Sequence, residues 1–171
     1  ITHYRYGDCT MSTLYVDTIN EKTSGNGVQI PGHVVQLAHS TTAGGLASAN
    51  SSSFADTGVS VSITPKYATS KILIIVHQVM AISTDAGHSR VDFRCIEAGG
   101  TEIYRMDYHG QDGTENLTQR NFAGSGVFQC SSTSALTFKT QAQKANGTEG
   151  AWYPLWYAES IHTMQALEIA Q

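Results

Sequence analysis

The sequence predicts an all-β fold, an antiparallel β-sandwich of jelly-roll-like type with an extended N-terminal arm. Short apolar segments recur at intervals of about 8 to 20 residues, Gly-, Ser- and Asn-rich breaks separate them, and no segment has convincing helical periodicity. A chain of 171 residues is long enough for one domain with one core. We therefore assign residues 1–31 to the arm and residues 32–171 to the β-sandwich domain.

The clearest strands lie in the first half of the domain. In residues 59–64, Val and Ile alternate with Ser and Thr, which predicts a strand with one buried and one solvated face that ends at Pro65. Residues 71–80 are apolar and β-branched without alternation, which is typical of a central strand covered on both faces. His77 is therefore expected in the core or at an interface.

A hairpin is predicted next. Residues 90–96 and 101–108 flank the Gly-rich turn at residues 98–100, and Val91, Phe93 and Cys95 share the face expected to be buried. Further strands are predicted at residues 127–130, 135–142, 152–157 and 161–169, with Gly-rich breaks at residues 124–126 and 146–150. We expect the aromatic residues between 152 and 157 to fill the core. In the last strand, one face carries Ile161, Thr163, Leu167 and Ile169.

The arm has a different character. Its apolar residues alternate weakly with polar ones, and residues 24–27 form a turn signal. They are too few to offset the cost of ordering the backbone, so we expect a partner to order the arm. The residues predicted to attach it are Leu14, Tyr15, Val16, Ile19, Val28 and Ile30.

Composition argues against several classes of partner. The net charge of -4 disfavours nucleic-acid binding, which normally requires a basic patch. No apolar run approaches the length of a membrane span, and no signal-peptide pattern is present, so no membrane insertion is expected. The three cysteines are far apart and form no CxxC pair, which predicts free thiols.

Clusters of polar residues give only weak evidence for a metal-binding or catalytic site. His88 lies near Asp85 and Asp92, and a predicted loop after Tyr108 brings together Asp107, His109 and Asp112. Such side chains can bind a divalent cation, but ordinary turns use the same residues, and the spacing is not that of a calcium loop. GxSxG and phosphate-loop motifs are absent. Paired carboxylates for glycoside hydrolysis would come together only in the fold.

We therefore predict no catalytic, cofactor-binding or metal-binding residue, and no enzyme. Surface loops are predicted instead to provide a receptor- or partner-binding surface, with the candidates Asp85, His88, Asp107, His109, Asp112 and Asn116.

Four segments carry a resemblance to a known group of proteins. They are STLYVDTINEKTSGNGVQI at residues 12–30, GHVVQLAH at 32–39, DTGVSVSITPKYATSKILIIVHQV at 56–79 and HTMQALEIAQ at 162–171. The chain resembles tail-fibre-like and other virion structural proteins of tailed bacteriophages, of the cyanophage and aquatic-phage type. Residues 81–156 depart from the resemblance, and residues 1–11 fall outside it.

The resemblance implies a virion surface protein made in the host cytoplasm. The expected subunit is a tail-fibre or receptor-binding appendage that docks on tail or capsid proteins by its arm and projects a homotrimeric β-sandwich, with a host surface glycan or protein as the receptor. The alternative is a capsid decoration protein of the cement or head-fibre type. A glycan hydrolase carried on a fibre is a further alternative.

Overall fold

The computed structural model describes residues 18–20, 30–43, 52–84, 87–112, 116–144, 150–153 and 160–171, and of residues 80–84, 87–90, 108–112, 116–120 and 150–153 it describes the backbone alone. The described residues contain nine strands and no helix, and so no helix that could cross a membrane. The strands are β1 (Val34–Ala43), β2 (Ala55–Ile63), β3 (Lys71–Thr84), β4 (Gly87–Glu97), β5 (Glu102–Asp112), β6 (Asn116–Gln129), β7 (Leu136–Lys144), β8 (Gly150–Tyr153) and β9 (Ile161–Ile169).

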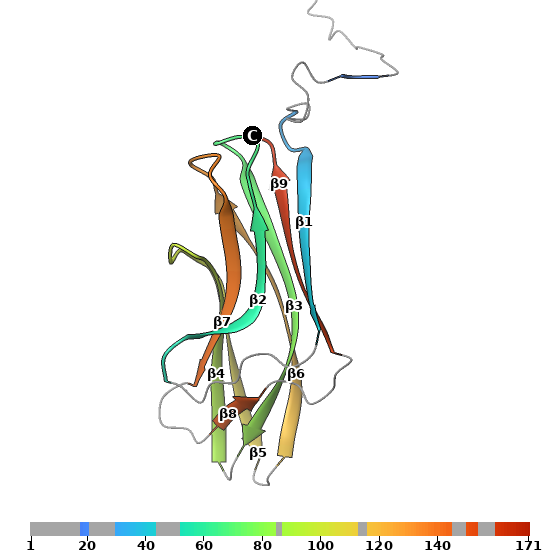
Figure 1. Cartoon of the computed structure of the whole chain (residues 1–171). Coiled ribbons are helices and arrows are strands. Elements are labelled where there is room, and N and C mark those ends of the chain that lie inside the picture. The colour runs from blue at the N-terminus through green and yellow to red at the C-terminus, as the bar shows by residue number, and fades with distance from the viewer. Residues whose placement is uncertain are drawn as a thin grey trace, which may run out of the picture.

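The strands form two antiparallel sheets that face each other (Figure 1). Sheet A has the order β1-β9-β3-β6, with β8 also paired to β3, and sheet B has the order β2-β7-β4-β5. The first strand pairs with the last, and each sheet combines strands from both halves of the chain, which is the strand order of a jelly roll. The predicted fold class, a jelly-roll-like antiparallel β-sandwich, is confirmed.

The core lies between the sheets because alternate residues of each strand point inward. Val59, Val61 and Ile63 of β2 are buried, as the alternation predicted. The predicted hairpin is also confirmed, since β4 pairs with β5 and buries Val91, Phe93 and Cys95. Other core side chains are Ile72, Ile74, Val76, Phe122, Phe138, Ala142, Met164 and Ala166.

Strand β3 is covered on one face only. Ile72, Ile74 and Val76 point into the core, whereas Ile75 and His77 are exposed on the opposite face. The prediction that both faces are covered is wrong for the single chain, and His77 is not a core residue. Its place at an interface stays a prediction. The sequence of β3 is apolar without alternation because most side chains on its outer face are apolar, as are most of those that point into the core.

Strand β6 continues through the glycines that were interpreted as a break. Gly124 and Gly126 lie opposite Val76 and Ile74 of β3, inside the strand. A Cβ at Gly124 would lie 2.6 Å from Cε2 of Tyr104, and one at Gly126 would lie 2.6 Å from Cγ2 of Ile103. Glycine is needed here because side chains of β5 approach the backbone, so the predicted break is wrong.

We expect Gly126→Ala to lower the free energy of unfolding by about 1 to 3 kcal/mol. The new methyl group would also lie 3.0 Å from the carbonyl oxygen of Ile103, a backbone atom that cannot move as freely as a side chain. Chemical denaturation would measure the loss. Ser60→Ala, on the exposed side of β2 in sheet B, is the control and should change stability little. Equal effects of the two substitutions would contradict this explanation.

A buried carboxylate fixes the connection between β2 and β3. Glu168 of β9 is fully buried and accepts hydrogen bonds from the backbone N–H of Lys66 (2.9 Å) and Tyr67 (3.1 Å) and from Nε2 of Gln36 (2.6 Å). Burial raises the pKa of Glu168, but these donors outweigh it and hold the pKa below its usual value of 4.5. The connection is thereby tied to both β1 and β9.

Candidate functional site

The outer face of sheet A is the first candidate surface. The register places Leu37 of β1, Leu167 of β9, Leu73 of β3 and Val127 of β6 in one row across four strands. Side chains in such a row are neighbours on the same side of the sheet. Four large apolar residues therefore cross the sheet on the side away from the core.

This face is exposed and almost uncharged. Leu37, Val127 and Ile161 are 59%, 55% and 56% exposed, and the central Ile75 is 39% exposed. Among the described residues of the face, Lys71 at one end is the one with a formal charge. The other members are Val34, His39, Thr41, Ala43, His77, Val79, Asn121, Ala123, Ser125, Gln129, Thr163, Gln165 and Ile169.

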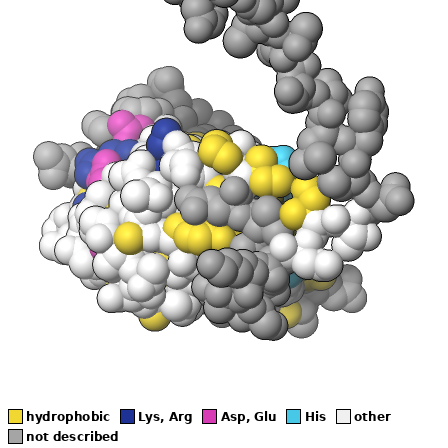
Figure 2. All heavy atoms as spheres, turned by 90° about the horizontal axis from the view of Figure 1, so that it is seen from above, with side chains coloured by type: hydrophobic (Ala, Val, Ile, Leu, Met, Phe, Trp, Pro, Cys, Tyr) yellow, Lys and Arg dark blue, Asp and Glu magenta, His cyan; other side chains and the backbone are white. Residues whose placement is uncertain are grey.

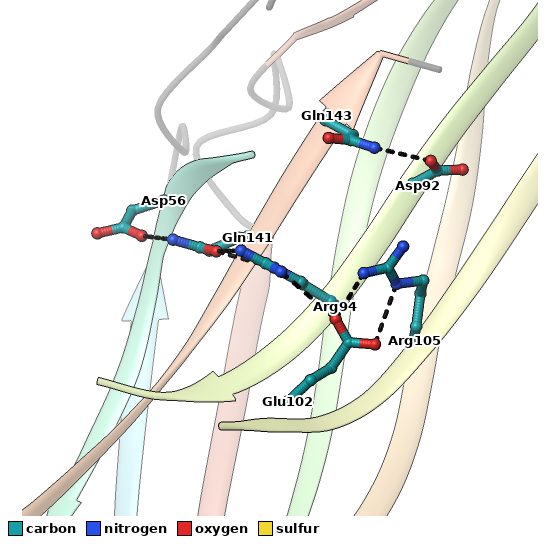
Figure 3. A network of polar contacts seen from close by, with 7 residues as sticks. All are labelled: Asp56, Asp92, Arg94, Glu102, Arg105, Gln141 and Gln143. Atoms are coloured by element: carbon teal, nitrogen blue, oxygen red, sulfur yellow. Dashed lines mark hydrogen bonds and ion pairs between the residues drawn. The ribbon is translucent and has the colours of Figure 1, made fainter. Parts of the chain in front are cut away.

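The outer face of sheet B is the second candidate surface, and a polar network crosses it (Figure 3). Nε and Nη2 of Arg94 donate to Oε1 of Gln141 at 2.9 and 2.7 Å. Nε2 of Gln141 donates in turn to Asp56 at 2.6 Å, and Nζ of Lys139 lies 2.8 Å from the other oxygen of Asp56. The hydrogen bond from Lys139 is the main reason why the pKa of Asp56 is lowered.

The same network continues to β5. Nε and Nη2 of Arg105 donate hydrogen bonds of 3.0 and 2.7 Å to the two carboxylate oxygens of Glu102. The hydrogen bonding by Arg105 is the main cause of the lowered pKa of Glu102. The guanidinium carbons of Arg94 and Arg105 lie 3.8 and 5.0 Å from the ring centre of Phe54. Both are within the range of a cation–π contact.

The two outer faces therefore differ in chemistry. In Figure 2 the Lys, Arg, Asp and Glu side chains in view gather at the upper left and the His side chains lie toward the right. Hydrophobic side chains extend from the centre to the right, with a few at the left and at the lower edge. On sheet B the guanidinium, carboxylate and amide groups of the network bind one another. On sheet A the exposed apolar side chains have no such partners within the sheet, and association with another apolar surface would remove them from water.

Five of the six predicted loop residues lie in strands. Asp107, His109 and Asp112 belong to β5, where Asp92, Arg90 and Gly87 of β4 are their partners, so the predicted loop after Tyr108 is wrong. His88 lies in β4, and Asn116 is the first residue of β6.

The backbone brings four of these residues to the same end of the sandwich, namely His88, His109, Asp112 and Asn116. Asp107 lies farther along β5 and is exposed. Asp85 is outside the described residues. Their role in binding a receptor or partner stays a prediction.

Of the residues predicted to attach the arm, the described part of the chain includes Ile19 and Ile30. Ile19 is 56% exposed, and the carbonyl of Ile30 accepts a hydrogen bond from the N–H of His33. Leu14, Tyr15, Val16 and Val28 lie outside the described residues, as do Trp156 and Tyr157, two of the aromatic residues expected in the core. Trp152 and Tyr153 of β8 are described by their backbone alone.

The described thiols are unsuited to nucleophilic chemistry. Cys95 and Cys130 are free and buried, and burial raises the pKa of Cys95 to about 12. Within the described part of the chain, no three His, Cys, Asp or Glu side chains form a group that could hold a metal ion.

Comparison with protein-family models and with curated proteins finds no match. Among solved structures, the chain is similar to dimeric latent PorU from Porphyromonas gingivalis, at 10% identity and a TM-score of 0.44, over 85% of this chain and 14% of PorU. It is also similar to a chain of the infectious bursal disease virus Gx strain, at 15% identity and a TM-score of 0.37, over 80% of this chain and 33% of the viral chain. Both similarities are too low to bear on function.

Proposed function

We propose that this chain is a bacteriophage virion structural protein, a surface appendage subunit of the tail-fibre or receptor-binding type. In this proposal the N-terminal arm docks on tail or capsid proteins, and the jelly roll projects as a homotrimer. The observation that carries the proposal is the sequence resemblance, which includes the arm and both ends of the sandwich domain.

The structure gives two of the resembling segments a common role. Lys66 and Tyr67 belong to the resembling segment 56–79, and Glu168 belongs to the resembling segment 162–171. The two segments meet where the carboxylate of Glu168 accepts hydrogen bonds from the backbone N–H groups of Lys66 and Tyr67. In the proposal, the arm and the two segments that form this buried contact are the parts that the chain shares with the phage proteins that it resembles.

The surfaces also favour a binding protein over an enzyme. A hydrolytic pair needs carboxylates with different environments placed around an open site. Asp56 and Glu102 instead each bind a cationic side chain, and the pKa of both is lowered, so neither is suited to act as a general acid. The absence of enzymatic activity remains part of the proposal, and release of host polysaccharide by the purified protein would contradict it.

We expect deletion of residues 1–30 to abolish incorporation into phage particles while the domain stays folded. The N–H of Gly32 donates to the carbonyl of Ala170, and β1 begins at Val34, so this deletion removes none of the described strands. Of the described contacts near the start of the domain, it removes the hydrogen bond from the N–H of His33 to the carbonyl of Ile30. Quantitative mass spectrometry of purified particles would measure incorporation, and thermal melting of the isolated protein would measure folding.

Deletion of residues 1–10, which lie outside the resemblance, is the matched control and should leave incorporation unchanged. Normal incorporation of the longer deletion would contradict the docking role of the arm. The number of copies per particle separates the appendage from the alternative, because a capsid decoration protein would be present in hundreds of copies.

A further inference from the structure

We infer that the outer face of sheet A is the surface through which copies of this chain associate with one another. This inference rests on the homotrimer of the proposed function and names the surface that would form it. The occupant of the face is a second copy of the chain.

The first argument is the distribution of exposed apolar side chains. Of the large hydrophobic residues that are exposed in the described chain, Leu37, Ile75, Val127 and Ile161 lie on this face, and Val34 lies at its edge. Exposed apolar residues scattered singly need no explanation, but a contiguous patch across four strands marks an interaction surface.

The second argument is the absence of charge. When identical surfaces meet around a two-fold or three-fold axis, residues near the axis face their own counterparts, so every charge near it would face a like charge. The four central positions on β3, which are Leu73, Ile75, His77 and Val79, include no Asp, Glu, Lys or Arg. Sheet B has Arg94, Glu102 and Arg105 on its outer face, so the difference is specific to sheet A.

The third argument is area. Four strands about 4.8 Å apart and about nine residues long, at about 3.3 Å per residue, make a face of about 570 Å². Around a three-fold axis each face is shared between two neighbours, so three such faces bury up to about 1,700 Å² together, or about 570 Å² at each of the three contacts. The total exceeds the roughly 1,000 Å² expected of a biological interface, so the face is large enough to be the main contact between copies.

The test compares charged substitutions on the two outer faces in the full-length chain. Light scattering of the unaltered protein at micromolar concentration should give the mass of a trimer. Ile75→Glu should give a monomer, with the dissociation constant raised at least about a hundredfold, because each copy would place a carboxylate in the apolar contact. Ser60→Glu, on the exposed side of β2 in sheet B, adds the same charge and should leave the trimer intact.

Folding is checked by circular dichroism, and Leu37→Glu at the edge strand β1 replaces Ile75→Glu if the latter does not fold. If the trimer persisted with Ile75→Glu and with Leu37→Glu, the assignment of the face would be wrong. It would also be wrong if Ser60→Glu dissociated the trimer as well. In both cases the protein would still be a homotrimer.

A monomeric unaltered chain would overturn the inference, while incorporation into particles would still decide the proposed function. If the full chain were monomeric but residues 31–171 associated, the arm and not a second copy would be the occupant.

Discussion

Phe93→Ala is expected to lower the free energy of unfolding by about 3 to 5 kcal/mol. Phe93 of sheet B is fully buried and stacks on Phe122 of sheet A, with ring centres 4.9 Å apart. Its ring also lies 6.4 Å from that of Tyr104. Truncation would remove one of the aromatic contacts between the sheets and leave a cavity that close-packed neighbours can fill only in part.

Chemical denaturation at equal protein concentrations would measure this loss, because association would make the midpoint depend on concentration. Phe93→Leu is the control, since it retains much of the side-chain volume and should cost markedly less. A loss below about 1 kcal/mol for Phe93→Ala would contradict the packing described between the sheets.

Glu168→Gln is expected to lower the free energy of unfolding by about 2 to 4 kcal/mol at neutral pH. The carboxylate accepts from two backbone N–H groups and from the amide of Gln36. A glutamine side chain has only one acceptor oxygen. Its NH₂ group would take the place of the other carboxylate oxygen and would face a second donor, either the amide NH₂ of Gln36 or a backbone N–H, with which it cannot form a hydrogen bond. At least one buried donor would therefore lose its partner.

The same substitution should change the response to acid. Because the pKa of Glu168 is lower in the folded chain than its usual 4.5, the unfolded chain binds the proton more tightly. The stability contributed by the carboxylate is then present above about pH 4.5 and is lost as the pH falls through the folded pKa. The difference in stability between the unaltered protein and Glu168→Gln should shrink over that range. A difference independent of pH would mean that the carboxylate charge is not responsible.

The sequence predicted those elements in which local pattern and burial agree. Val59, Val61 and Ile63 alternate with polar residues, and β2 buries them as expected. The apolar run of β3 predicted the strand but not the exposure of Ile75, because an apolar residue that faces a core and one that faces solvent look alike in sequence. The pattern of apolar residues therefore identifies a strand more reliably than it shows whether each face of the strand is covered.

Other features depend on residues far apart in the chain. Gly124 and Gly126 have the composition of a turn, and only the approach of Tyr104 and Ile103 shows why a strand needs glycine there. Glu168 gave no signal at all, because its partners include backbone N–H groups about a hundred residues away. Apart from His77, the outer face of sheet A was not predicted as a surface, because its rows form only when β1, β9, β3 and β6 are aligned.

The position of β9 has a consequence for how the chain reaches its fold. β9 lies between β1 and β3, and Gln36 is separated from Glu168 by 132 residues of chain. During synthesis β1 leaves the ribosome first among the strands, yet its one strand partner in the described structure is the last to be made. Closing so long a loop is slow, and until it closes β1 and β3 present unpaired edges that can bind other nascent chains. Chaperone dependence and temperature-sensitive yield during expression are the expected signs of this late step.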